Sequence, residues 1–264
     1  MAGVFKLPRD SAITGFWVNL LGQVLLLFVV VPFLFGFHDR SRPFSVYLSE
    51  IRLTKMKPVL KLILLGISCY LFLALSMFLG TLVFRLSQGY AFNMDFFRTA
   101  FPLTSELPPN SSGWLFSIPP SLLEEVTFRG IFLALFLRFY NKPKAIFFSA
   151  LCFGAMHLLN LLNDGPELVW VAAQVVWALI LGLFYGYITL KTDSLLPAML
   201  IHYLGNISIY PLTAYIQHNA SIPVQALFGI TFTLGVIPAV LMWLWARTFT
   251  SKWPVNQGPV NTGT

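Results

Sequence analysis

Seven apolar stretches, each roughly as long as a membrane-crossing helix, dominate this sequence; they cover residues 16–36, 60–84, 115–137, 145–162, 168–190, 195–217 and 223–246. A helix of about 20 apolar residues crosses the hydrocarbon core of a bilayer, which is about 30 Å thick. Only 10% of the residues are charged, whereas about a quarter is usual in soluble domains. The sequence therefore predicts an all-α, polytopic transmembrane helix bundle with about seven to eight spans.

A single integral membrane domain over residues 1–264 fits this pattern, with a motif-bearing core at about 115–217 and a disordered tail at about 253–264. The first stretch is too long for a signal peptide and lacks a clear cleavage site, so we expect a retained span. Residues 45–56, "SVYLSEIRLTKM", mix apolar and basic side chains. This mixture predicts an additional helix at the membrane interface.

The formal net charge of +7 is distributed over short segments between the apolar stretches and forms no stripe. Such charges indicate membrane topology, so a lipid bilayer is the expected partner and nucleic acid is not. Residues 37–58, 138–144 and 247–252 hold most of the basic side chains and are predicted to face the cytoplasm, with the N-terminus outside. The longest external segment is expected at residues 85–113. The protein is predicted to be multi-pass, in the cell (inner) membrane if its source is prokaryotic.

Three charged residues lie inside the third apolar stretch: Glu124, Glu125 and Arg129. Placing a charge at the centre of a bilayer costs at least about 2.5 to 3.5 kcal/mol, so such residues face the interior of a bundle and usually serve a purpose. Glu125 and Arg129 are four residues apart and share a helix face, so they are expected to pair. Glu124 points to a different sector and is left free to act as a general base. The alternative is that all three form a structural ion cluster between helices.

Two further stretches carry histidine: "FGAMH", Phe153 to His157, and "HYLGN", His202 to Asn206. His202 and Asn206 are four residues apart and point the same way. A single intramembrane histidine often only bonds a neighbouring helix, but here three spans carry polar groups that each have an insertion cost. Together they suit hydrolysis, because a carboxylate and an imidazole activate water while imidazole and amide donors stabilise an oxyanion.

Other chemistries are less well supported by the spacing of these residues. Ser121 lies one turn before Glu125, but no arrangement of serine, histidine and orienting acid is readable from the sequence. Two histidines and a glutamate are able to bind zinc; however, HExxH is absent and the histidines lie on separate stretches. We therefore expect no cofactor or metal, with a zinc protease on the same residues as an alternative. A second alternative is a noncatalytic membrane immunity factor or scaffold protein.

The three motifs occur in the order and separation of a known family. "EEVTFR", "FGAMH" and "HYLGN" resemble EExxxR, FxxxH and HxxxN of the CPBP family (CAAX proteases and bacteriocin-processing enzymes, also called the abortive-infection family) of glutamic intramembrane endopeptidases. The resemblance covers about residues 117–210. It implies that Glu124 and His157 activate water and that His202 and Asn206 stabilise the oxyanion. Glu125, Arg129 and Phe153 would then support the site.

The resemblance also implies the kind of substrate. Members of the family act on membrane-associated proteins or peptides; some remove the last three residues of prenylated CaaX proteins, and bacterial relatives process leader-type peptides. We therefore expect a hydrolase of the peptidase class whose partner is a peptide or protein substrate at the membrane.

Overall fold

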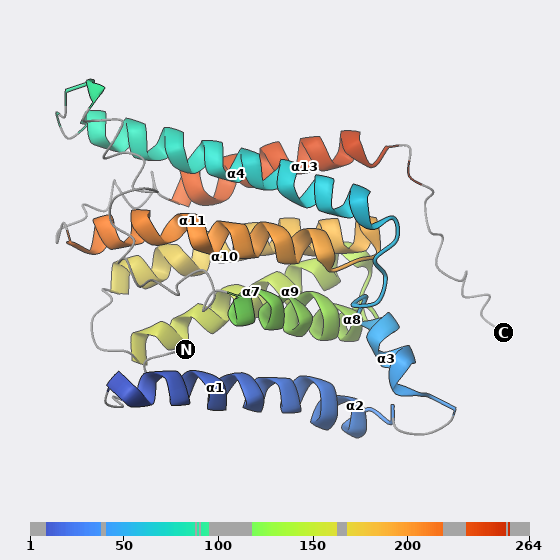
Figure 1. Cartoon of the computed structure of the whole chain (residues 1–264). Helices are drawn as coiled ribbons and strands as arrows, with labels where there is room; N and C mark the ends of the chain where they lie inside the picture. The colour runs from blue at the N-terminus through green and yellow to red at the C-terminus, as the bar shows by residue number, and fades with distance from the viewer. Residues whose placement is uncertain are drawn as a thin grey trace.

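The computed structural model describes residues 9–37, 41–87, 89, 91–94, 118–162, 168–218, 231–251 and 253. Every regular element in these ranges is helical, and the long helices lie side by side with their axes roughly aligned (Figure 1). Five of the described helices are long and apolar enough to cross a membrane: Phe16–Leu34, Val59–Gly80, Lys142–Leu162, Leu168–Thr192 and Phe232–Phe249. The predicted all-α membrane bundle is thereby confirmed. Most of the predicted external segment, from residue 95 on, and nearly all of the predicted tail lie outside the described ranges.

Each predicted span coincides with a helix in the part of the chain that the structure describes. In chain order these are α1 (Arg9–Leu25) with η1 (Leu26–Val30) and α2 (Val31–Leu34); α4 (Val59–Ser87); α7 (Ile118–Glu125) with η2 (Val126–Phe132) and α8 (Leu133–Phe136); α9 (Lys142–Met156) with η3 (His157–Leu162); α10 (Leu168–Thr192); α11 (Leu196–His218); and η4 (Phe232–Val236) with α13 (Ile237–Phe249). Two of the seven, α7–η2–α8 and α11, are not among these five helices, and both carry polar motif residues. The helix expected within 45–56 is α3 (Phe44–Glu50).

The larger apolar core lies between α4, α9, α10, α11 and α13. Helices α9 and α10 approach most closely at glycines: a Cβ added to Gly182 would lie 3.1 Å from Ala150 Cβ, and one added to Gly186 would lie 3.0 Å from a methyl carbon of Ile146. Gly182 and Gly186 are four residues apart on α10, as Ile146 and Ala150 are on α9. The two contacts therefore lie one helical turn apart. Small side chains of this kind let two helix backbones approach in a membrane.

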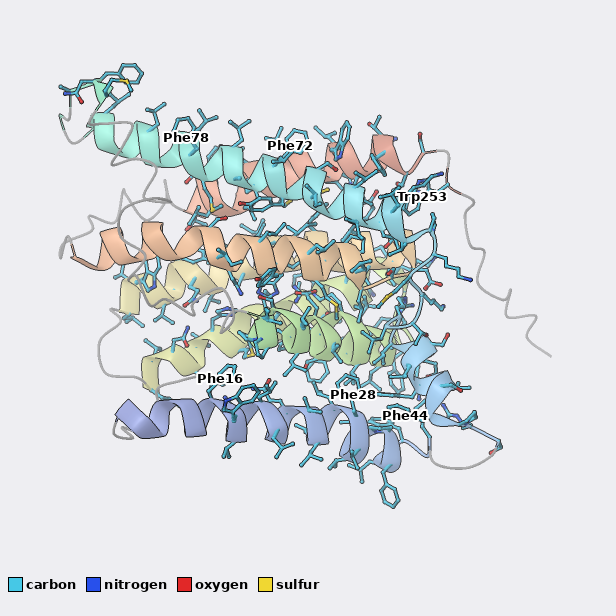
Figure 2. The ribbon with its side chains drawn as sticks, viewed as in Figure 1. Phe16, Phe28, Phe44, Phe72, Phe78 and Trp253 are labelled. Carbon is cyan, nitrogen blue, oxygen red and sulfur yellow. The ribbon has the colours of Figure 1, made fainter. Side chains whose placement is uncertain are left out.

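A second core joins the N-terminal helices to the motif-bearing ones. Leu27, Tyr47 and Leu123 belong to it, and Phe28 points from η1 toward the rest of the bundle and packs against it (Figure 2). The Tyr47 hydroxyl donates a 2.6 Å hydrogen bond to the carbonyl of Leu27, which lies in the π-helical turn before Pro32. Because a π turn and a proline both disturb the backbone ladder, this bond satisfies a carbonyl at the point where the helix is weakest.

Ion pairs connect the basic segments at one end of the bundle. Asp193, between α10 and α11, contacts Arg52 at 3.0 Å and Lys55 at 2.6 Å. Glu50, at the end of α3, contacts Arg138 at 3.2 Å. Helix α13 also ends on this side (Figure 1). The described parts of the basic segments thus gather at the same end, as predicted from their charge, while the assignment of that end to the cytoplasm stays a prediction.

Candidate active site

The charged motif of the third span lies where the helix changes from an α-helical to a π-helical hydrogen-bond pattern. The α-helical hydrogen-bond pattern of α7 ends at Glu125, and the π-helical turn η2 carries Arg129. Turns of this kind are rare and occur often at functional sites. Ser149 of α9 donates a 2.6 Å hydrogen bond to the carbonyl of Phe128 within the turn. The turn is therefore tied to α9, the helix that leads to His157.

Glu125 and Arg129 form the pair that their spacing predicts. Arg129 Nη1 lies 3.1 Å from Glu125 Oε1, and both side chains are fully buried. The guanidinium carbon lies 4.1 Å from the ring centre of Phe153 and 5.2 Å from that of Tyr185. A guanidinium over aromatic faces gains electrostatic attraction that partly offsets its lost hydration. Breaking a buried pair would leave one charge uncompensated, so the two residues have a strong structural role.

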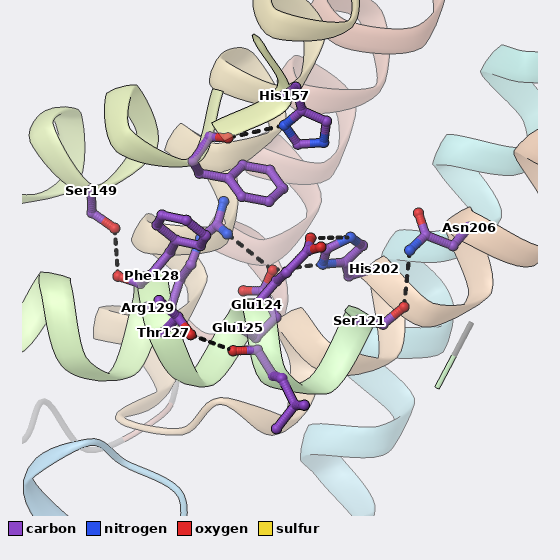
Figure 3. Close-up of polar contacts among 12 residues, drawn as sticks. Ser121, Glu124, Glu125, Thr127, Phe128, Arg129, Ser149, His157, His202 and Asn206 are labelled. Carbon is purple, nitrogen blue, oxygen red and sulfur yellow. Dashed lines mark hydrogen bonds and ion pairs between the residues drawn. The ribbon is translucent and has the colours of Figure 1, made fainter. Parts of the chain in front are cut away.

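His202 of α11 lies between the two glutamates (Figure 3). Its Nδ1 is 2.8 Å from Glu125 Oε1, the same oxygen that contacts Arg129, and its Nε2 is 3.7 Å from Glu124 Oε2. A carboxylate accepts hydrogen bonds, so Nδ1 carries the hydrogen and Nε2 is the atom that faces Glu124. The Glu124 side chain is 23% exposed and that of Glu125 is 0% exposed. Glu124 is therefore the more accessible of the two glutamates.

His157 follows the last turn of α9 and faces the aromatic ring of its own motif. Its Nδ1 lies 3.0 Å from the carbonyl oxygen of Phe153 and must donate to it, since a carbonyl only accepts. The Phe153 ring packs edge-to-face against His157, with centroids 5.1 Å apart, and against His202, with centroids 5.7 Å apart. Phe153 thus contacts both imidazoles as well as the guanidinium of Arg129.

Asn206 lies one turn beyond His202 on α11 and reaches across to α7. Its Nδ2 donates a 3.0 Å hydrogen bond to the hydroxyl oxygen of Ser121 (Figure 3). Ser121 is fully buried. The structure thus links Glu124, Glu125, Arg129, Phe153 and His202 in one set of contacts; His157 joins them through Phe153, and Asn206 is held beside them by Ser121.

Tyr185 is a member of this group that the sequence analysis did not identify. Its ring stacks on His202 with centroids 5.7 Å apart and an angle of 25° between the planes, and it also faces Arg129. Nothing in the apolar sequence of α10 distinguishes this tyrosine from a core residue. The hydrogen bond of Ser121 to Asn206 was missed as well, although the position of Ser121 one turn before Glu125 was a usable signal.

His202 and the two glutamate side chains of the site are already engaged with one another. His202 directs both of its nitrogens at carboxylates, and Glu125 Oε1 is shared between His202 and Arg129. Among the residues that the structure describes, no three His, Cys, Asp or Glu side chains are arranged to hold a metal ion. Zinc needs several such donors directed at one point; the absence of a metal stays an expectation from the sequence.

Comparison with known proteins gives one match. Residues 109–208 match the family model named Rce1-like, described as type II CAAX prenyl endopeptidase Rce1-like. The matched segment contains all three motifs, and residues 109–117 of it lie outside the described ranges. No curated protein and no solved structure matches the chain.

Proposed function

Because residues 109–208 match the model of the Rce1-like type II CAAX prenyl endopeptidases, we propose that this protein is a membrane peptidase that hydrolyses its substrate with water activated by Glu124. The family supports a CAAX-type protease in general. The glutamate mechanism, the residues that carry it and the substrate are parts of the proposal, as is a location in the cell membrane.

One observation carries the assignment of Glu124: two adjacent glutamates have different surroundings. Both oxygens of Glu125 are buried, and one of them is shared by a guanidinium and an imidazole. Glu124 is partly exposed, and its nearest described ionic partner is Nε2 of His202 at 3.7 Å, beyond ordinary hydrogen-bond distance. A carboxylate in this position is able to take a proton from water, which is the task of a general base.

In the proposed reaction, Glu124 and His157 orient one water molecule and Glu124 takes its proton as the oxygen attacks the scissile carbonyl carbon. The negative charge on the carbonyl oxygen is stabilised by donors from His202 and Asn206. The carbon–nitrogen bond then breaks, and the leaving amine takes the proton from Glu124. Donation by Nε2 of His202 requires hydrogen on both ring nitrogens. In that form two carboxylates are balanced by one guanidinium and one imidazolium, which lowers the cost of burying the group.

The proposed substrate is a membrane-associated protein or peptide, prenylated or of the leader type. The described helices α2, α4 and α9 expose large apolar side chains, among them Phe33, Leu71 and Phe147. Such surfaces suit contact with lipid. A substrate with a lipid anchor is confined to the same bilayer and reaches the protein by lateral diffusion.

The test is cleavage by the purified protein in liposomes. We expect a farnesylated CaaX peptide or a leader-type peptide to be cut at one bond, identified by mass spectrometry, and Glu124→Gln to leave the same peptide intact. Glu50→Gln is the matched control, because Glu50 is a surface glutamate paired with Arg138 at the end of the bundle. Equal cleavage by Glu124→Gln would refute the mechanism. No cleavage of any peptide by the wild type would instead favour a noncatalytic immunity or scaffold protein.

A further inference from the structure

Two polar contacts join α7 and α11 with the same spacing on both helices. The first pairs Ser121 Oγ with Asn206 Nδ2 at 3.0 Å, and the second pairs Glu125 Oε1 with His202 Nδ1 at 2.8 Å. Ser121 and Glu125 are four residues apart on α7, and His202 and Asn206 are four residues apart on α11. Residues at this spacing lie one above the other on a helix face. The two helices therefore run antiparallel here, and each contact lies one turn from the other.

The first contact determines the direction of the Asn206 amide. A carboxamide is planar and carries two N–H donors and one oxygen acceptor. When one N–H is bound to Ser121, the direction of the second N–H and of the oxygen is fixed by the same plane. Ser121 is 0% exposed, so bulk water does not compete for this bond. A buried polar contact of this kind rigidifies the groups that share it.

We propose that Ser121 is a positioning residue, which holds the carboxamide of Asn206 so that its second N–H points at the oxyanion. This inference depends on the proposed function, in which Asn206 is an oxyanion donor. Helix α7 would then supply both the base, Glu124, and the anchor of the donor, three residues before it. The base and the anchor of the donor would be held at a fixed separation by one rigid helix, as preorganised transition-state stabilisation requires.

A nucleophilic role for Ser121 is not supported by the same contact. The Ser121 oxygen accepts a hydrogen bond from an amide nitrogen, and an amide is not a base that takes a proton from a hydroxyl. A serine nucleophile needs an adjacent base, usually histidine. The contact with Asn206 therefore indicates an orienting role for the hydroxyl.

The test is a double-mutant cycle with full-length protein in liposomes and the peptide that the wild type cleaves. Ser121→Ala should lower kcat about tenfold with KM unchanged within about twofold, because a misdirected Asn206 amide would lose about 1.4 kcal/mol of interaction with the oxyanion, which exists only in the transition state. Asn206→Ala should lower kcat at least about 100-fold, as removal of one oxyanion donor does in other hydrolases. Adding Ser121→Ala to Asn206→Ala should cost nothing more.

Two further variants separate orientation from packing. Ser121→Cys keeps the volume of the side chain but is a weak acceptor, so its kcat should fall almost as far as that of Ser121→Ala. Ser76→Ala removes a buried hydroxyl of α4 that bonds the Phe72 carbonyl, and its kcat should match the wild type. Wild-type kcat in both Ser121 variants, or an equal loss from Ser121→Ala with and without Asn206, would overturn the inference while leaving the proposed function intact. Wild-type kcat in Asn206→Ala would overturn the oxyanion assignment itself.

Discussion

Glu125 accepts a hydrogen bond from Nδ1 of His202 at 2.8 Å across the contact between α7 and α11. The same carboxylate oxygen lies 3.1 Å from Arg129. Because this oxygen is shared by two donors, Glu125 serves to orient the imidazole, as the carboxylate does for the histidine of a serine protease triad. The other face of the imidazole, at Nε2, is turned to Glu124. In the proposed mechanism, the two neighbouring glutamates therefore have different roles: Glu125 orients the imidazole and Glu124 transfers the proton.

Removing Arg129 should strongly destabilise the fold. Arg129→Ala leaves the fully buried Glu125 without its guanidinium, and breaking one partner of a buried pair costs about 3 to 5 kcal/mol. Thermal unfolding in detergent, followed by labelling of the buried thiol of Cys69, measures this loss. Arg138→Ala is the control, because its pair with Glu50 is largely exposed and such pairs contribute about 1 kcal/mol or less. Equal melting temperatures for the two variants would contradict the assigned role of Arg129.

A methyl group at Gly182 should disturb both packing and activity. A Cβ there would lie 2.9 Å from Arg129 Nη2 and 3.1 Å from Ala150 Cβ, so Gly182→Ala forces α10 or the guanidinium to shift at a cost of about 1 to 3 kcal/mol. We expect a lower melting temperature and slower peptide cleavage. Gly22→Ala provides the comparison, since nothing lies within 4 Å of its Cβ position, and it should be neutral or stabilise α1 by up to about 1 kcal/mol. The reverse order of stabilities would show that the α9–α10 contact is looser than described.

The Tyr185 ring should contribute more to kcat than the Tyr185 hydroxyl does. Tyr185→Phe keeps the ring that stacks on His202 and faces Arg129, so its kcat should stay close to that of the wild type. Tyr185→Leu removes the aromatic face, and an aromatic contact worth about 0.5 to 1.5 kcal/mol corresponds to a roughly two- to tenfold loss of kcat. Steady-state kinetics of both variants provide the measurement, with KM expected to be unchanged. If the leucine variant is as active as the phenylalanine variant, the ring only fills space.

The helices were predictable because the requirement to cross a bilayer determines the length and composition of each apolar stretch. Within one helix, spacing also sufficed: the four-residue separation correctly predicted the pair of Glu125 and Arg129 and left Glu124 apart from it. The same separation placed His202 and Asn206 on one face. These predictions depend on helix geometry alone and need no knowledge of the neighbouring helices.

Contacts between helices were not predictable in the same way. Spacing shows which residues share a helix face. It does not show which other helix packs against that face, or at which position along the helix axis the two meet. The hydrogen bond between Ser121 and Asn206 depends on the relative position of α7 and α11 along their axes, and the stacking of Tyr185 on His202 depends on how α10 packs against α11. The π-helical turn η2 had no sequence signal, since its hydrogen-bond pattern is partly supported from α9 by Ser149.

The most direct measurement compares Glu124→Gln with Glu125→Gln for peptide cleavage and thermal unfolding in the same membranes. If Glu124 is the base, Glu124→Gln should lower kcat at least about 100-fold, the usual contribution of a general base, while its melting temperature stays near that of the wild type. Glu125→Gln should lower the melting temperature as well as kcat, because it removes the charge that faces Arg129. Cleavage by Glu124→Gln within a few fold of the wild type would contradict the account.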